Sequence, residues 1–366
     1  MSAETTPGWR GFATRPGAAQ VDWTPRGDYR RILNLKSCEL QHPAADELIA
    51  DALKEVTPAR IWGYPYQWGL VERLAEIHDV DPEALLLTAG SCSAIALVVD
   101  ALAAPAGRIL LQEPSFESWR HYSALRGVQR TRCRGLYGTP PAPTYDELLA
   151  ALPSSPPAVV AVTNPGNPTG FVTPVEEMAV LAGSAAEHGH LLVIDECYAA
   201  FCGITHVGLV SRFPNVVVLR SLSKSWALAG ARLAAVFSTP EIIRYLRRFR
   251  TDSPVSGPAV ALAEALSHRL PELAAIWADV RRIRDEFAAR VLTDQPEWTA
   301  LRPGANFVTF ATGTAGEGSR LEEALRGRGI RGRGLDTVDG MAGCLRLSLA
   351  DRERMGAVAD VLAELA

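Results

Sequence analysis

Short apolar runs alternate with helical patterns through the first two thirds of the chain. Five runs stand out: ALLLTAG from Ala84, RILLQEP from Arg108, AVVAVT from Ala158, LLVID from Leu191 and VVVLR from Val216. The segments between them repeat apolar residues at helical spacing, as in SCSAIALVVDALA and FESWRHYSALRG. A strand that is apolar at nearly every position is buried on both faces. The pattern therefore predicts an α/β fold with a mostly parallel sheet covered by helices on both faces.

The pattern changes at both ends of this alternating region. The first ~30 residues contain Gly, Pro and Trp without periodicity, which predicts an arm. A helix is expected from about Ala44 to Val56, and the following IWGYPYQWG is expected to be irregular. From Pro254 onward long helical segments run through Leu292, and a strand NFVTF, a helix, a strand CLRLSL and a closing helix follow. We predict an arm with part of the small domain at 1–44, a large domain at 45–253 and a smaller α+β domain at 254–366.

Composition restricts the function classes. The net charge of −4 gives no basic surface for nucleic acid, and no apolar run reaches membrane-spanning length. The N-terminus lacks the apolar core of a signal peptide. Six scattered cysteines without a C-x-x-C pair indicate reduced thiols and a cytoplasmic location, and the histidines show no metal-binding spacing.

Lys224 is the first candidate for chemistry. The chain has 37 basic residues, but only Lys36, Lys54 and Lys224 are lysines. An amine can form an imine with an aldehyde, whereas a guanidinium cannot. Lys224 lies in SLSKSWALAGAR, which begins at Ser221, directly after an apolar run. This placement suggests covalent chemistry; the alternative is a lysine on a surface loop.

Polar residues follow four of the predicted strands, at the edge where parallel strands bind ligands. They are the Gly90-Ser91-Cys92 turn, the NPGNPTG loop with Asn167, Asp195 followed by Tyr198, and the Ser/Lys stretch with Ser221, Ser223 and Lys224. Each could be only a turn or a helix cap. Four together predict one site.

DECY, NPGNPTG and SLSK with Arg232 resemble the motifs of the pyridoxal-phosphate (PLP) aminotransferases of the aspartate-aminotransferase-like fold, fold type I. Within that family the chain most resembles the histidinol-phosphate aminotransferase branch. The similarity extends from about Leu33 to the C-terminus.

The resemblance implies a role for each motif residue. Lys224 would be the Schiff-base lysine, and Asp195 would keep the ring nitrogen of the cofactor protonated so that the ring can accept electrons. The remaining cofactor contacts would be Asn167 and Tyr198 at the phenolic oxygen, Phe116 stacked on the ring, and Gly90, Ser91, Cys92, Ser221, Ser223 and Arg232 at the phosphate. Tyr64 would reach the phosphate of a neighbouring subunit, which implies a homodimer.

The resemblance also implies residues that would bind the substrate, but two family motifs differ in this part of the sequence. Arg346 in CLRLSL would grip a substrate carboxylate, with Asn167 and Glu39 nearby, and Arg333 would meet a distal anion. The family usually has Asn-Glu-Asn-Pro near its start, whereas this chain has Ser37 to Leu40 and keeps only Glu39. A Leu349-Ala350 pair replaces the usual Gly-containing turn after Arg346. Histidinol phosphate and other amino acids or oxo acids stay open as substrates.

We expect a homodimeric aminotransferase that exchanges an amino group between an amino acid, or an amino-alcohol phosphate, and a 2-oxo acid by ping-pong half-reactions. A PLP-dependent decarboxylase, cyclase, lyase or oxidase on the same scaffold is the main alternative, and a PLP-binding regulatory protein ranks below it. Gly327 to Gly332 satisfies G-x-G-x-x-G, but it follows a helix and precedes a strand, the reverse of a dinucleotide site.

Overall fold

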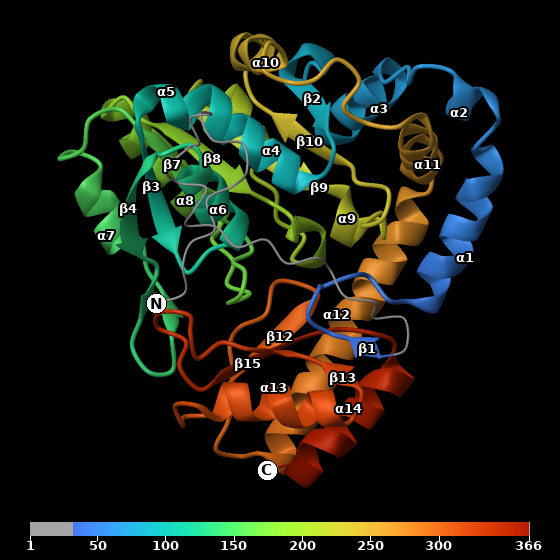
Figure 1. Cartoon of the computed structure of the whole chain (residues 1–366), viewed down its shortest axis with the longest axis vertical. Coiled ribbons are helices and arrows are strands. Elements are labelled where there is room, and N and C mark those ends of the chain that lie inside the picture. The colour runs from blue at the N-terminus through green and yellow to red at the C-terminus, as the bar shows by residue number, and fades with distance from the viewer. Residues whose placement is uncertain (1–31, 366) are drawn as a thin grey trace, which may run out of the picture.

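The computed structural model describes residues 32–365, in which a seven-stranded sheet forms the centre of the larger lobe (Figure 1). The predicted arm at residues 1–31 lies outside the described residues. Along the sheet the strands are β2 (Leu85–Thr88), β10 (Ala234–Phe237), β9 (Val216–Ser221), β8 (Leu191–Asp195), β7 (Val159–Thr163), β3 (Arg108–Glu113) and β4 (Gln129–Arg134). All neighbours are parallel except β10, which is antiparallel to β2 and β9. The predicted α/β class with a mostly parallel sheet is confirmed.

Two strands of this sheet do not appear in the apolar pattern. β10 is only four residues long and follows the Ser/Lys stretch after a short loop. β4 has the sequence QRTRCR, with five of its six positions exposed. It is an edge strand, and charged side chains on an edge strand oppose pairing with other molecules.

The sheet is covered on both faces, because alternate residues of its strands enter two separate cores. One core joins Leu192 and Val218 to helices α3 (Trp68–His78), α7 (Asp146–Ala151), α8 (Val175–Glu187) and α11 (Gly257–Ser267). The other joins Val193 and Val217 to α4 (Ser91–Val98), α6 (Glu117–Leu125) and α10 (Pro240–Arg247). Three layers result, and the carboxyl ends of the parallel strands face the smaller lobe.

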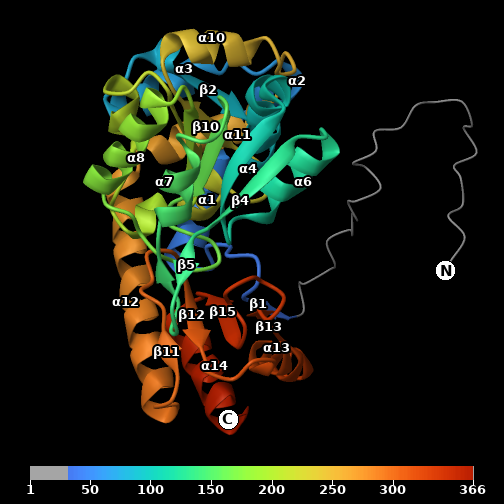
Figure 2. The same cartoon turned by 90° about the vertical axis from the view of Figure 1, so that its left-hand side faces the viewer.

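The smaller lobe is built on a four-stranded sheet in the order β11 (Thr299–Ala300), β12 (Phe307–Ala311), β15 (Cys344–Ser348) and β14 (Arg333–Gly334). Helices α13 (Glu317–Gly327) and α14 (Arg352–Leu365) flank it, and the long α12 (Leu270–Asp294) runs from the larger lobe into it (Figures 1 and 2). β1 (Leu33–Asn34) pairs in parallel with β13 (Ile330–Arg331), so the N-terminal segment lies against this lobe. The hairpin of β5 (Leu136–Tyr137) and β6 (Ala142–Pro143) extends toward it from the larger lobe.

The remaining elements are short. The α-helices among them are α1 (Pro43–Ala52), α2 (Ala59–Trp62), α5 (Ala104–Ala106) and α9 (Leu222–Ser225). The others are 3-10 turns at Leu53–Glu55, Pro82–Ala84, Ala199–Phe201 and Val207–Ser211, and a π-helical segment at Val99–Ala103. The helix expected near Ala44–Val56 is therefore present as α1 followed by the turn at Leu53–Glu55. The expectation of wholly irregular structure for IWGYPYQWG is wrong at its ends, because α2 extends into Trp62 and α3 starts at Trp68. Only Gly63–Gln67, which contains Pro65, is not helical.

The domain boundaries at residues 44 and 253 stay predictions. In residues 32–365 no helix is long and apolar enough to cross a membrane.

Candidate active site

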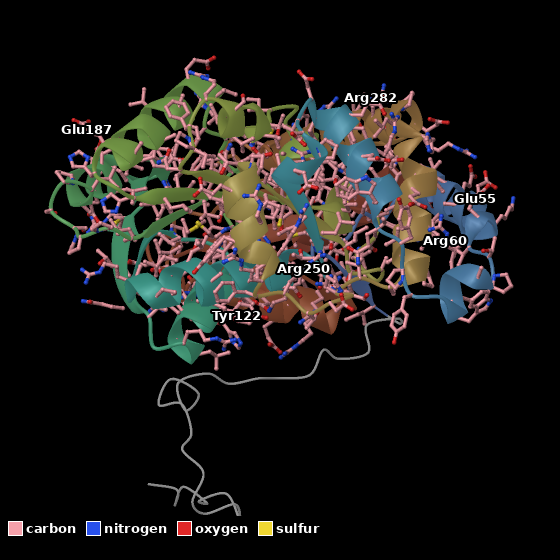
Figure 3. The ribbon with its side chains drawn as sticks, turned by 90° about the horizontal axis from the view of Figure 1, so that it is seen from above. Glu55, Arg60, Tyr122, Glu187, Arg250 and Arg282 are labelled. Atoms are coloured by element: carbon pink, nitrogen blue, oxygen red, sulfur yellow. The ribbon has the colours of Figure 1, made fainter. Side chains whose placement is uncertain are left out.

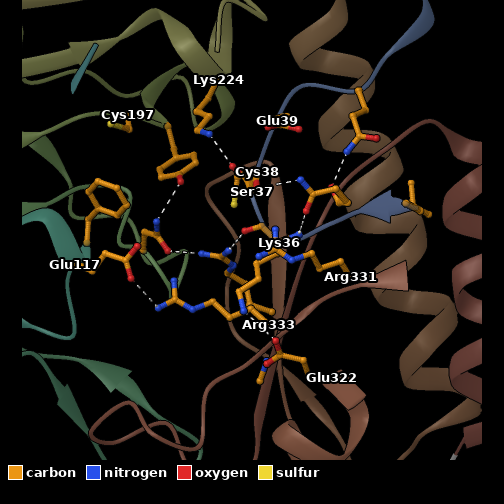
Figure 4. A pocket seen from close by; sticks show the side chains of 18 of the residues that line it. Lys36, Ser37, Cys38, Glu39, Glu117, Cys197, Lys224, Glu322, Arg331 and Arg333 are labelled. Carbon is orange, nitrogen blue, oxygen red and sulfur yellow. Dashed lines mark hydrogen bonds and ion pairs between the residues drawn. The ribbon is translucent and has the colours of Figure 1, made fainter. Parts of the chain in front are cut away.

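A cavity of 1410 Å³ opens between the carboxyl ends of the sheet and the smaller lobe. Figure 4 shows Lys224 on its upper wall and Arg333 and Glu322 on its lower wall. Most of the sequence-predicted residues line it: Glu39, Ser91, Phe116, Asn167, Asp195, Tyr198, Lys224, Arg333 and Arg346. These nine predicted residues therefore line one cavity, to which both lobes contribute, and their roles stay predictions.

Lys224 reaches this cavity because a strand turns directly into a helix in front of it. β9 ends at Ser221, whose side chain accepts a hydrogen bond from the backbone N–H of Ser223 and so caps α9. Lys224 stands in the single turn of α9, and its Nζ donates to the backbone oxygen of Ser37 at 2.6 Å. No ion pair between Lys224 and a carboxylate is found within residues 32–365, so the amine is held by a neutral partner.

Asp195 is a fully buried carboxylate at the carboxyl end of β8. The Cys197 thiol donates to Oδ1 at 3.0 Å, while no described residue bonds to Oδ2. Burial raises the pKa of Asp195, and the hydrogen bond from Cys197 counteracts part of this rise. A buried carboxylate oxygen without a donor is costly, so the site is suited to a cationic donor such as a protonated ring nitrogen.

Asn167 connects Tyr198 to Arg346. Its amide nitrogen donates to the Tyr198 hydroxyl at 3.1 Å, and its oxygen accepts from Arg346 Nη1 at 2.5 Å. Arg346 is 2% exposed, lies over the ring of Phe307 at 5.2 Å and also donates to the backbone oxygen of Lys36. Burial raises the pKa of Tyr198 well above its ordinary value, so this hydroxyl keeps its proton and can donate it in a hydrogen bond.

The predicted phosphate cradle is assembled around Gly90. This residue has φ +83°, and a Cβ placed on it would lie 2.5 Å from Nη2 of Arg232. Only glycine therefore lets the guanidinium approach the start of α4 so closely. Nη1 of Arg232 lies 3.5 Å from Ser223 Oγ and 3.0 Å from the oxygen of Ala229. Backbone N–H groups at a helix start, hydroxyls and one arginine suit a phosphate dianion.

Six predicted residues do not line the cavity. Four of them, Gly90, Ser221, Ser223 and Arg232, belong to the predicted phosphate cradle, and the other two are Cys92 and Tyr64. The Sγ of Cys92 lies 3.5 Å from Ser118 Oγ. Tyr64 is 94% exposed, between α2 and α3, and contributes nothing to the cavity of its own chain. Its predicted action on a second subunit stays a prediction.

Sequence reasoning missed the backbone of the segment Lys36–Cys38. Its carbonyl oxygens accept from Arg346, Lys224 and Asn306, at sequence separations of more than 180 residues. Backbone acceptors carry no residue signature, so no sequence signal could have revealed them. Cys197 was also missed as a partner of Asp195, although its place two residues later in DECY could have suggested it.

The sequence model of the family "Aminotransferase class I and II" matches residues 31–362. The chain belongs to this family. Two relatives, both named histidinol-phosphate aminotransferase, come from Syntrophotalea carbinolica and Citrifermentans bemidjiense. The first is 30% identical over 347 residues, covering 92% of this chain and 94% of that protein. The second is 32% identical over 302 residues, covering 80% of each.

Solved structures of aminotransferases share the fold. The histidinol-phosphate aminotransferase of Sinorhizobium meliloti, solved with pyridoxal-5'-phosphate, has a TM-score of 0.82 at 22% identity and covers 98% of each chain. The L-threonine-O-3-phosphate decarboxylase of Porphyromonas gingivalis has a TM-score of 0.75 at 16% identity, covering 91% of this chain and 99% of that one. This fold therefore carries more than one reaction in proteins of known structure.

Proposed function

We propose that this aminotransferase uses PLP to exchange an amino group between an amine donor that carries an anionic group and a 2-oxo acid. An amino acid and an amino-alcohol phosphate are both donors of this kind. Bound PLP supplies an aldehyde carbon that joins to amines and a ring that accepts electrons from the substrate. The observation that carries the proposal is the convergence of Lys224, the partnerless oxygen of Asp195 and Arg346 on one cavity.

Lys224 serves as the amine that holds PLP and as the base that moves the substrate proton. Its Nζ lies in the cavity on a backbone oxygen, so no ion pair has to break before the amine reacts. When not joined to PLP, the Lys224 amine would be a base inside the same cavity that could take a proton from the substrate. One residue then performs binding and proton transfer.

Different residues are assigned to the ring nitrogen, the phenolic oxygen and the phosphate of PLP. Asp195 Oδ2, which has no partner among the described residues, would hold the ring nitrogen of PLP, and Asn167 and Tyr198, which are hydrogen-bonded to each other, would offer donors to its phenolic oxygen. Gly90, with the helix start at Ser91 and with Arg232, fits the phosphate. These contacts fix the orientation of the ring, which reduces the entropy lost on reaching the reactive geometry.

The substrate anion is assigned to two neighbouring arginines. Arg333 and Arg346 are cross-strand partners on β14 and β15, and both line the cavity. Burial and the charge of Arg346 lower the pKa of Arg333. The carboxylate nearest to Arg333 within the described chain is that of Glu117, at 3.9 Å. Arg333 and Arg346 are therefore two neighbouring cations with one carboxylate among the described residues, that of Glu117, within 4 Å of Arg333, and this arrangement favours an anionic ligand. The name of the relatives, histidinol-phosphate aminotransferase, supports a phosphate ester as one such ligand.

A half-reaction screen tests the proposal. Holoenzyme is mixed with amino acids, amino-alcohol phosphates and neutral amines, and conversion of the bound cofactor to pyridoxamine phosphate is followed by absorbance. We expect conversion with anion-bearing donors and reversal by 2-oxo acids. Release of CO2, ammonia or peroxide without pyridoxamine phosphate would instead identify a decarboxylase, lyase or oxidase.

We propose that the enzyme is a homodimer in which Tyr64 completes the partner's phosphate site. Four large side chains near the start of α3 are exposed: Ile61 (69%), Trp62 (79%), Tyr64 (94%) and Tyr66 (67%). A group of exposed apolar and aromatic side chains of this kind indicates a protein interface. Arg60 of the same region lies at the end of the molecule opposite Glu187 of α8 (Figure 3). We assign the contact between the two subunits to the end that carries Arg60. The cytoplasmic location stays a prediction.

Subunit exchange tests this assembly. Lys224→Ala and Tyr64→Phe protomers are each impaired, but their hybrid carries both defects at one site and none at the other. Mixing them should therefore restore part of the activity. Full activity of a monomer in sedimentation would contradict the shared site.

A further inference from the structure

Cys197 is a buried thiol that touches the carboxylate at the centre of the site. It lies two residues after Asp195, is 8% exposed, and its Sγ donates to Asp195 Oδ1 at 3.0 Å. The other oxygen, Oδ2, is buried and has no bonding partner among the described residues. The thiol therefore distinguishes the two oxygens of this carboxylate: it bonds to Oδ1 and leaves Oδ2 without a partner among the described residues.

The surroundings keep this thiol protonated. Burial, followed by the negative charge of Asp195, raises the pKa of Cys197 well above its ordinary value. Three other groups act on Asp195: the Trp119 indole N–H lowers its pKa without reaching hydrogen-bond geometry, the backbone N–H of Cys197 also lowers it, and the Glu196 charge raises it. Lys224 is the cation that acts on the thiol. Cys197 is thus a stable S–H donor rather than a nucleophile.

We propose that Cys197 is a positioning residue that holds Oδ1 of Asp195 and thereby directs Oδ2 to the ring nitrogen of PLP. The inference rests on the proposed function and goes beyond it by assigning one oxygen to each partner. The bond from Cys197 would also affect the proton that lies between the Asp195 carboxylate and the ring nitrogen of PLP. A carboxylate that already accepts an S–H bond is a weaker base, so the proton stays on the ring nitrogen and the ring remains electron-poor.

Four variants separate hydrogen bonding from packing. Cys197→Ala and Cys197→Val both remove the donor, but one side chain is smaller and the other larger than cysteine. Cys197→Ser keeps a donor. Cys202→Ala is the matched control, because Cys202 is a partly buried thiol of the same region that, among the described residues, bonds only to the backbone oxygens of Ala199 and Ile204.

Two measurements do not depend on turnover. In holoenzyme loaded with ring-¹⁵N-labelled PLP, the nitrogen resonance reports whether the ring is protonated. We expect it to move toward the neutral pyridine value in both donor-free variants and to stay in place in Cys197→Ser and Cys202→Ala. PLP should also bind about threefold to tenfold more weakly without the donor, as for the loss of one ordinary hydrogen bond, because a thiol is a weak donor.

In cofactor-free protein, ¹³C-carboxyl labelling of aspartate follows Asp195 itself, with its resonance assigned by its loss in Asp195→Asn. The carboxyl pKa should be higher in Cys197→Ala than in the parent protein. An unchanged carboxyl titration, or an equal change in Cys202→Ala, overturns the inference whether or not PLP binds. Failure of the parent protein to bind PLP would instead count against the proposed function.

Discussion

Arg346→Lys tests the substrate clamp most directly, because it keeps the charge and removes the planar fork. The guanidinium is buried, and in the ligand-free arrangement it donates to Asn167 Oδ1 and to the oxygen of Lys36 over the ring of Phe307. A substrate carboxylate would accept two parallel hydrogen bonds from such a fork. Lysine offers one ammonium on a flexible stem and cannot make this paired contact.

The expected loss follows from one charge-assisted hydrogen bond. Such a bond contributes roughly 1.5–3 kcal/mol, which corresponds to a decrease in kcat/KM of about 10- to 150-fold. Both half-reactions should be affected alike, because amino acid and oxo acid present a carboxylate to the same place. Pre-steady-state absorbance of the cofactor measures each half-reaction separately.

Two further variants sharpen the assay. Arg326→Lys changes an exposed arginine of α13 that pairs with Glu323, and it should leave both half-reactions unchanged. Arg333→Ala should weaken phosphate-bearing donors more than carboxylate donors if Arg333 meets the distal anion. If Arg346→Lys has parent-like kcat/KM with every donor and acceptor, the clamp assignment is wrong.

Three other changes have defined outcomes. Lys224→Ala should abolish turnover, and borohydride should attach the cofactor to Lys224 of the parent protein, as peptide mass mapping would show; labelling at another lysine contradicts the assignment. Asp195→Asn should reduce transition-state stabilisation by about 3–5 kcal/mol, as for removal of a buried charge partner, and so lower kcat/KM by about 150- to 5,000-fold; a parent-like rate would place the ring partner elsewhere. Burial lowers the pKa of His78 to about 3, so the unfolded chain binds its proton first as the pH falls below about 6.5. The free energy of unfolding should then fall by up to ~2 kcal/mol between pH 7 and pH 5, and denaturant titration of His78→Gln should show a smaller decrease.

Much of the larger lobe is encoded in local patterns. Runs such as VVVLR are apolar at consecutive positions because both faces of the sheet are covered, and such runs predict β9 and its neighbours. The same rule fails for β4, whose arginines reflect its place at the sheet edge. β10 was missed because half of its AAVF sequence is alanine, a residue of low strand propensity, whereas the equally short but leucine-rich β2 was predicted.

The residues of the candidate site also differ in how far the sequence could predict their positions. Asp195 and Lys224 could be placed together from sequence, since parallel strands end at one edge of a sheet and each follows such an end. The contact between Arg346 and Asn167 joins residues 179 positions apart on different lobes. The alternation in CLRLSL indicates that Arg346 lies opposite Leu345 and Leu347, but only the family resemblance indicated what it faces.

The segment Lys36–Cys38 shows why the rest had no local signal. Its three successive carbonyl oxygens accept from Arg346 of β15, from Lys224 of α9 and from Asn306 at the start of β12. Cys38, the last of the three residues, adopts φ 55°, a left-handed conformation that is strained for a residue with a side chain. Strain of this kind persists only where the surrounding contacts outweigh it, and here those contacts come from both lobes. The conformation of the segment is therefore a consequence of the assembled site, which brings together the candidate Schiff-base lysine and the candidate substrate arginine.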